Sequence, residues 1–178
     1  TAFGVIDFRN GNDDIIWDNG TGGHAVLWQF SGSTLSAAVD PGGAMGPEWH
    51  VAATADFSGS GNAALLWENT SGQVVAWYYN GTALGSTAYV NGTVSPESKV
   101  VATGDFFQTG QAAALWEDGG GRLQDWLLNG PSIQSAQTVG QIGPEWHVAG
   151  VGEFNGISSG DATSDFVWVN TSNHVQIW

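Results

Sequence analysis

The stretch Gly46-Pro47-Glu48-Trp49-His50 governs the interpretation of this 178-residue chain, because it returns as Gly143-Pro144-Glu145-Trp146-His147. A weaker copy, Ser95-Pro96-Glu97-Ser98-Lys99, lies between the two. An acidic residue followed by Phe recurs in phase with them, and so do two sets of tryptophans. These markers are Asp7, Asp56, Asp105 and Glu153, which step by 49, 49 and 48 residues, then Trp17, Trp67, Trp116 and Trp168, and Trp28, Trp77, Trp126 and Trp178. A period near 49 residues is typical of propellers, solenoids and arrays.

Each unit has the pattern of several short strands separated by polar turns. In the second unit, segments 51–57, 63–67, 73–79 and 86–90 are short and rich in apolar, β-branched and aromatic residues. A solenoid of this period would more often carry a helix, whereas four short antiparallel strands make the blade of a propeller. We therefore expect an all-β fold, a β-propeller whose units span approximately 1–49, 50–98, 99–146 and 147–178.

The fourth unit ends in its third expected strand, so the chain holds about four blades and the last is incomplete. Three interpretations of the ring remain open. The chain is a fragment of a longer protein, or four narrow blades close alone, or two copies form a homodimer that completes a larger propeller. The last follows from the tendency of exposed strand edges to pair.

The amino-acid composition limits the classes of partner that the chain can bind. Seventeen acidic residues against three basic ones give a formal net charge of −14, which excludes nucleic acid as a partner because phosphates need clustered Lys and Arg. No apolar run reaches membrane length, so no membrane insertion is expected. The chain has no cysteine, which rules out disulfides and thiolate metal sites. An acidic surplus favours cations, or simple solubility.

The motifs also carry a family resemblance. Asp-Phe-x-Gly-x-Gly-x-x-x-Leu-Leu-Trp at 56–67, then Gly-x-Val before Trp77 and Asn80-Gly81, and Gly-Pro-x-Trp-His-Val at 46–51 and 143–148 resemble VCBS/FG-GAP repeats. That resemblance implies a propeller of the integrin-like or bacterial lectin-like kind, and a secreted or extracellular location. It does not imply an activity, because one propeller fold hosts unrelated functions.

The resemblance further implies a calcium loop after each acid-Phe pair, since calcium takes six to eight oxygen ligands. Units two and three have Ala64 and Ala113 at the position where the closing acidic ligand belongs, so we expect backbone hydrogen bonds to hold those turns. Units one and four keep more oxygen ligands and are the candidates for Ca²⁺. The alternative is that these residues only make Asx-turns. The candidate ligands are Asp7, Asn10, Asn12 and Asp14 in unit one, and Glu153, Asn155, Asp161 and Asp165 in unit four.

Most tryptophans recur at fixed strand positions, which predicts that they pack between blades. Trp49 and Trp146 differ, since they lie in a connecting stretch beside polar residues. Aromatic faces beside polar side chains bind sugars, and repeated sites add avidity. The alternative is that the Pro-Glu-Trp-His turn only locks one blade to the next. The candidate sugar-binding residues are Trp49, His50, Glu48, Trp146, His147, Glu145, His24 and His174.

No sequence motif assembles a nucleophile, a base and an orienting group, and Glu48 and Glu145 repeat at equivalent positions instead of meeting in one site. We therefore expect a non-catalytic extracellular binding module, not an enzyme. Carbohydrate binding is the first hypothesis. The alternatives are a calcium-steadied protein-interaction or adhesion module, or an accessory domain of a secreted hydrolase. The expected partners are glycans or a cell-surface or extracellular protein.

Overall fold

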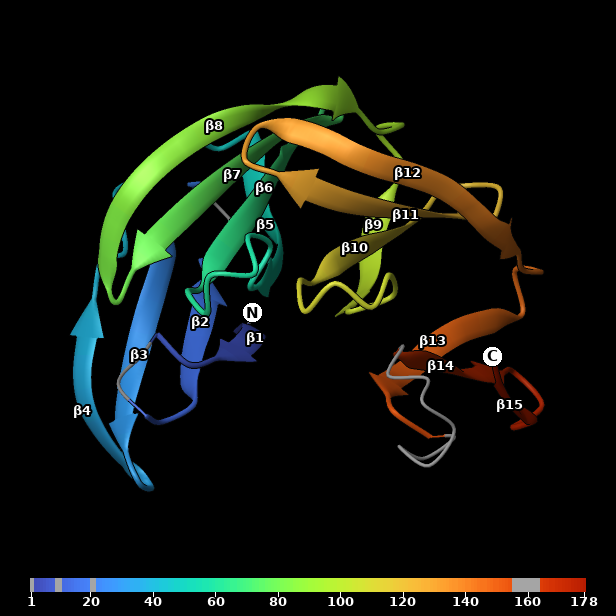
Figure 1. Ribbon diagram of the computed structural model, residues 1–178, viewed down its shortest axis with the longest axis horizontal. Coiled ribbons are helices and arrows are strands. Elements are labelled where there is room, and N and C mark those ends of the chain that lie inside the picture. Colours follow the sequence, from blue (N-terminus) through green and yellow to red (C-terminus); the bar gives the residue numbers. More distant parts are fainter. Residues whose placement is uncertain (1, 9–10, 20–21, 155–163) are drawn as a thin grey trace.

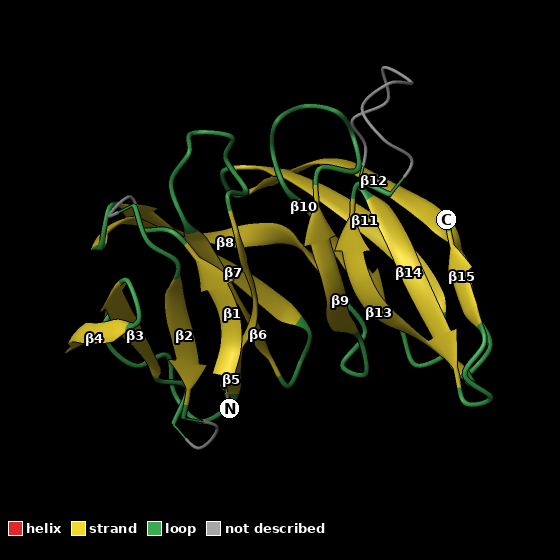
Figure 2. Ribbon diagram, turned by 90° about the horizontal axis from the view of Figure 1, so that it is seen from below, coloured by secondary structure: helices red, strands yellow, loops and turns green. Residues whose placement is uncertain are grey.

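The computed structural model describes residues 2–8, 11–19, 22–154 and 164–178, and these form strands, turns and loops but no helix (Figures 1 and 2). The strands make three antiparallel sheets of four and one of three, each in simple up-and-down order. They are β1 (Ala2–Ile6), β2 (Asp14–Asp18), β3 (Ala25–Ser31) and β4 (Thr34–Val39); β5 (Trp49–Ala55), β6 (Ala64–Asn69), β7 (Gln73–Asn80) and β8 (Ala83–Thr93); β9 (Lys99–Gly104), β10 (Ala113–Glu117), β11 (Arg122–Asn129) and β12 (Ser132–Gln141); and β13 (Trp146–Gly152), β14 (Asp165–Asn170) and β15 (Val175–Ile177).

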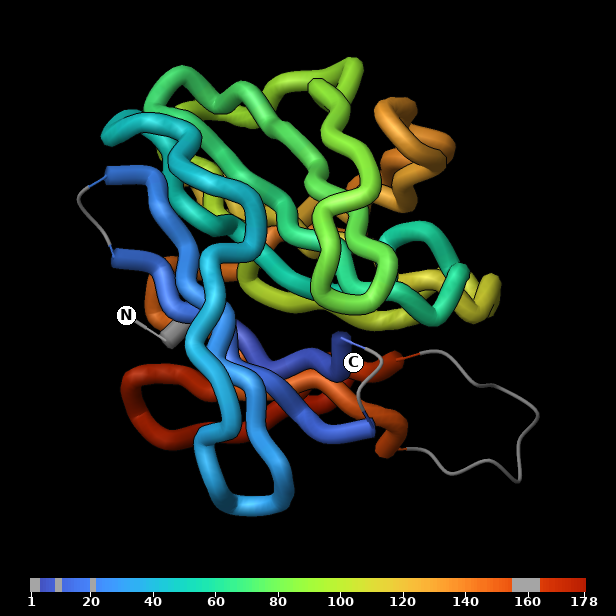
Figure 3. The backbone as a smooth tube through the Cα atoms, turned by 90° about the vertical axis from the view of Figure 1, so that its left-hand side faces the viewer, coloured from blue at the N-terminus to red at the C-terminus, as the bar shows by residue number. Residues whose placement is uncertain are grey.

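The four sheets are arranged around a central axis as the blades of a four-bladed β-propeller (Figure 1). The first strands of the blades, β1, β5, β9 and β13, lie innermost, and each contacts the next along the chain. The outer strands β8 and β12 also touch, and Figure 3 shows the β3–β4 hairpin projecting from the first blade. The prediction of an all-β propeller built from repeated blades is confirmed.

The core lies between blades. One apolar cluster joins Ile16 and Leu27 of the first blade to Trp67 and Trp77 of the second. The next joins the second and third blades, and the last the third and fourth. In every blade the tryptophan of the second strand packs at a tilt against the tryptophan in or just after the third, with ring centroids 4.8 to 5.4 Å apart. The prediction that these recurring tryptophans form the interblade core is confirmed for Trp67, Trp77, Trp116, Trp126 and Trp168. Trp17 and Trp28 are half-buried, and Trp178 is 44% exposed.

A left-handed glycine in the turn between the second and third strands connects each of the first three blades to the linker that leaves it. Gly72 has φ of 76°, and its carbonyl accepts a hydrogen bond from Val94 N at 2.9 Å. A Cβ on Gly72 would lie 2.0 Å from the Val94 oxygen, so only glycine fits this approach. The same pairing recurs between Gly23 and Met45, and between Gly121 and Ile142.

Candidate functional site

The loops after the acid-Phe pairs of units two and three are closed by their own backbone. Asp56 accepts hydrogen bonds from the N–H groups of Ser58 and Ser60, at 3.1 and 3.2 Å, and from that of Gly61. Asp105 accepts from Thr109 N at 2.9 Å and from Gly110 N at 2.7 Å. The prediction that backbone hydrogen bonds hold these two turns is therefore confirmed.

In the first loop, Asp7 accepts a hydrogen bond from Gly11 N at 3.2 Å, and the fully buried Asp14 accepts one from Phe30 N at 3.1 Å. Asn12 accepts from Gly32 N at 3.4 Å. These three residues are thus engaged with the backbone of the first blade. Asp14 in particular holds the end of β3 against β2.

In the fourth loop, Asp165 accepts from Phe154 N at 2.8 Å, while Glu153 is exposed. Asn10, Asn155 and Asp161 lie outside the described residues. Within the part of the chain that the structure describes, no three His, Asp or Glu side chains gather in a way that could hold a metal ion. Calcium binding by the first and fourth loops stays a prediction.

The Gly-Pro-Glu-Trp stretch is a tight turn into the first strand of its blade. Trp49 N donates to the carbonyl of Gly46 at 3.1 Å, and Trp146 N donates to that of Gly143 at 3.0 Å. The weaker copy makes the same bond from Ser98 N to Ser95 O, at 2.8 Å. The turn is therefore structural in all three units, whichever residue follows the glutamate.

Identical motifs meet different surroundings. Trp49 is only 7% exposed and packs edge-on against Tyr89, with ring centroids 6.2 Å apart. Trp146 is half-buried and lines a cavity. The glutamate carboxylates Glu48 and Glu145 are exposed and fold back over the glycines that begin their turns.

The four predicted histidines are separated in the structure. His50 is exposed, with Nε2 3.7 Å from the carboxylate of Glu68, and His147 lies opposite Val169 in the β13–β14 register. His24 Nε2 lies 3.0 Å from Asp40 Oδ2, and backbone hydrogen bonds to Asp40 lower the pKa of that carboxyl. The four histidines do not converge on one centre, so they do not make a shared site.

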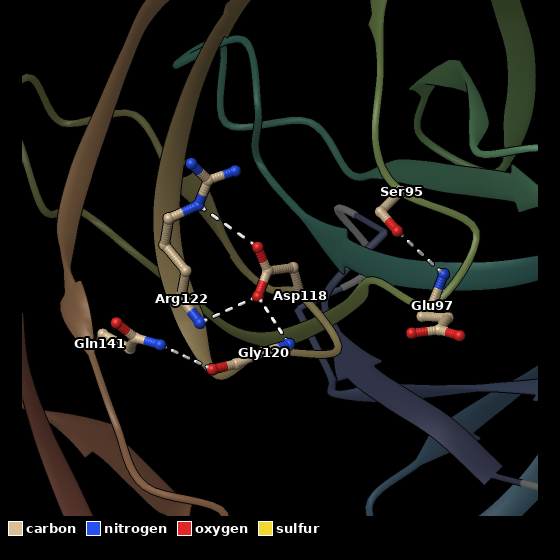
Figure 4. Close-up of polar contacts among 6 residues, drawn as sticks. All are labelled: Ser95, Glu97, Asp118, Gly120, Arg122 and Gln141. Carbon is tan, nitrogen blue, oxygen red and sulfur yellow. Dashed lines mark hydrogen bonds and ion pairs between the residues drawn. The ribbon is translucent and has the colours of Figure 1, made fainter.

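His174 shares a repeat position with Arg122, and an Asx residue four positions earlier anchors each. Asn170 Oδ1 accepts from His174 N at 2.9 Å. Asp118 Oδ1 accepts from the backbone N–H of Arg122 at 3.0 Å and of Gly120 at 2.9 Å, while Arg122 Nε lies 3.3 Å from Asp118 Oδ2 (Figure 4). Those hydrogen bonds lower the pKa of Asp118. These contacts fix where the third strand of the blade begins.

Two cavities occupy equivalent places in the third and fourth blades, beneath the linker that enters each blade. The first, of about 110 Å³, lies among Ser95, Ser98, Trp116, Asp118, Arg122 and Gln124. The second, of about 120 Å³, lies among Gln141, Gly143, Trp146, Trp168, Gln176 and Trp178. The first cavity is polar, and the second combines tryptophan faces with two side-chain amides.

A departure from the repeat places a polar side chain on the lining of each cavity. Gln124 and Gln176 lie opposite the second-strand tryptophan of their blades, where the first two blades have Val26 and Val75. In the second blade, Val75 belongs to the apolar cluster that also contains Trp49. We did not identify these glutamines from the sequence, although comparing the four units position by position would have found them.

The tryptophan beside each cavity has an unused donor. The indole N–H groups of Trp116 and Trp168 are buried, and no acceptor for them exists among the residues described here. The same holds for Trp17 and Trp67. A ligand oxygen or a water at each position would satisfy this donor, because buried N–H groups seldom remain unpaired.

A third cavity, of about 480 Å³, follows the central axis between the inner strands β1, β5 and β9. Its lining is uncharged, and apart from Thr54 and Thr103 the side chains are small and apolar. It offers few polar groups to orient a ligand, so we consider the cavities at the blade junctions the better candidates.

The fold and these cavities define the chain as a repeat β-propeller with polar and aromatic cavities beneath its interblade linkers. It matches no protein-family model, and no curated protein is similar to it. In the described ranges, no helix has the length and hydrophobicity needed to cross a bilayer.

Proposed function

We propose that this chain is a non-catalytic carbohydrate-binding module, and that its principal sugar site is the cavity beneath the linker entering the fourth blade. One observation carries the proposal: the half-buried Trp146, the partly exposed Trp178 and the amides Gln141 and Gln176 surround a single cavity of about 120 Å³. Indole faces together with amide groups are suited to the apolar face and the hydroxyls of a sugar.

Each lining group has a definite part. The C–H face of the sugar packs on Trp146 or Trp178. Gln141 is held in place because its Nε2 donates to Gly120 O at 3.0 Å, which leaves its Oε1 to accept from a hydroxyl (Figure 4).

The equivalent cavity of the third blade is a second subsite with different chemistry. Ser98 stands where the fourth blade has Trp146, and Arg122 and Asp118 line the cavity. It therefore offers hydrogen bonds and charge in place of a stacking surface. Two subsites on one chain would raise the avidity for a repeated glycan, even where each alone is weak.

A protein-interaction module is the runner-up, favoured by the last described strand. β15 pairs only with β14 among the described strands, and its residues Val175 and Ile177 are 63% and 56% exposed. An unpaired apolar edge strand is a template for another chain, either a partner or a second copy. This reading does not account for the cavities, so we place it second.

The test is a glycan array with the purified chain, run once with calcium and once with EDTA, followed by two variants that exchange repeat residues. Trp146→Ser installs the residue of the third blade, and Gln176→Val installs the residue of the first two. Each is expected to weaken binding about tenfold or more, since about 1.4 kcal/mol corresponds to a factor of ten. Gln134→Val, on an exposed part of β12 outside the cavity, is the control.

Silence of folded protein in both conditions would refute the carbohydrate proposal. Binding that survives both cavity variants would refute the placement of the site. Loss of binding in EDTA alone would assign a structural or direct part to the first or fourth loop.

A further inference from the structure

Asp125 is a buried carboxyl group at a position that is apolar in the other blades. It lies on β11 opposite Leu115, and only 4% of its surface is exposed. The equivalent residues, which lie opposite the same point of the second strand, are Leu27, Ala76 and Ile177. The third blade alone therefore carries an acid on this face.

No group in the described part of the chain offsets the cost of burying Asp125. Its Oδ1 is buried and has no hydrogen-bond partner. Burial raises the pKa of Asp125 to about 7. A buried polar group without a partner is costly, and Leu27 and Ile177 show that the repeat accommodates an apolar residue here. The cost of burying the Asp125 carboxyl indicates a ligand that donates a hydrogen bond to it.

Asp125 lines a groove of about 450 Å³ between the third and fourth blades. Three of its described lining residues are aromatic: Phe106 and Phe166 pack with ring centroids 4.6 Å apart, and Trp178 is 44% exposed. Asp165 is a second carboxylate on the lining, and none of the described residues that line the groove is basic. The groove thus combines negative charge with flat apolar faces.

We propose that this groove binds an organic primary ammonium group carried on a short apolar body, with an ammonium N–H donated to Asp125 and the body packed against Trp178 and Phe106. Carboxylate and aromatic faces together are the chemistry that recognises organic cations. A bare divalent cation fits less well, because among the described residues no three acidic or histidine side chains gather here to hold it.

Two sources can present this chemistry, a free amine or the lysine side chain of another protein. The proposal can be tested separately from the carbohydrate proposal, because Asp125 does not line the sugar cavity and Trp146 does not line this groove. Trp178 lies on both linings, so we leave it unchanged in the tests of either site.

The experiment is isothermal titration of the whole chain at pH 8 and low salt with three matched probes. Benzylammonium has charge and donors, benzyltrimethylammonium has charge without donors, and benzyl alcohol has a donor without charge. We expect benzylammonium to bind at least about tenfold more tightly than the other two, the factor that one charge-assisted hydrogen bond supplies. Equal binding of the three probes, or no binding of benzylammonium, would overturn the proposal.

Two variants test the residue itself. Asp125→Asn keeps the shape of the side chain and should weaken benzylammonium binding at least about tenfold. Asp125→Leu installs the residue of the first blade and should abolish binding while melting at a higher temperature, so lost binding cannot be confused with unfolding. Glu68→Gln, which removes a buried carboxyl elsewhere, is the matched control and should bind as the unchanged chain does.

The source is distinguished by adding Nα-acetyl-lysine amide as a fourth probe. Binding of this derivative as tight as that of benzylammonium assigns the groove to a lysine side chain of a partner. Selective binding of benzylammonium assigns it to free amines. Undiminished binding in Asp125→Asn would show that the carboxylate plays no part, and the proposal would fail.

Discussion

Replacing Glu68 by Gln should stabilise the protein at alkaline pH and leave it unchanged in acid. Glu68 lies on β6 with 1% of its surface exposed, and its Oε2 has no hydrogen-bond partner within the described chain. His50 Nε2 approaches this oxygen only to 3.7 Å, which is too far for a hydrogen bond. Burial raises the pKa of Glu68 from 4.5 to about 7.

The direction and size follow from proton linkage. Between pH 4.5 and about 7 the folded protein holds a proton on Glu68 that the unfolded chain has lost. The free energy of unfolding therefore falls as pH rises through this window. A difference of roughly 2.5 pKa units at about 1.36 kcal/mol each costs about 3 kcal/mol at pH 8. The glutamine amide stays buried and keeps part of this cost, so we expect a net gain of about 2 kcal/mol.

The assay is urea unfolding of both proteins at pH 4, 5, 6, 7 and 8, since linear extrapolation gives the free energy at each pH. Glu117→Gln is the control, because Glu117 occupies the same repeat position but is partly exposed and lies 3.5 Å from Lys99. It should change stability by no more than about 1 kcal/mol at any of these pH values. A Glu68→Gln gain of equal size at pH 4 and pH 8 would refute the argument.

Two further changes test the repeat architecture by urea unfolding. Gly72→Ala should destabilise the protein by more than about 2 kcal/mol, because the new Cβ would lie 2.0 Å from the Val94 carbonyl oxygen. The control is Gly32→Ala, which should cost only about 1 kcal/mol, because Gly32 has φ of 60° but no neighbour within 4 Å of the added Cβ. Equal losses of stability in the two variants would contradict the steric reasoning. Tyr78→Phe should cost about 1 kcal/mol, because Tyr78 Oη donates to Gly130 O at 2.7 Å and joins the second blade to the third; an unchanged midpoint would show that this bond contributes nothing.

The sequence predicted the architecture well because the residues that recur are the ones that pack. Trp67 and Trp116 are buried between blades, as their 49-residue spacing indicates. The loops of the second and third units were also predictable, since Asp56 and Asp105 are each followed by short polar residues whose backbone N–H groups donate to that carboxylate. Such features depend only on local chain geometry.

The environment of Trp49 could not be predicted in the same way. Its five-residue motif is identical to the one around Trp146, yet Trp49 belongs to an apolar cluster with Val75, while Trp146 lines a cavity together with Gln176. The difference comes from residues far from the motif in the sequence. A local pattern fixes the turn, and residues of the third strand of the blade, Val75 or Gln176, contribute to the surroundings of its tryptophan.

The departures from the repeat are more informative about function than the repeat itself. Residues shared by all units maintain the packing that every blade needs, so they would be retained with or without a ligand. Gln124, Gln176 and Asp125 instead place polar groups where other blades have Val, Leu, Ala or Ile, and the burial of Asp125 without a partner lowers stability. Because the apolar alternative is present in the same chain, packing alone does not explain the buried Asp125. All three residues lie in the third and fourth blades, which is why both proposed sites fall there.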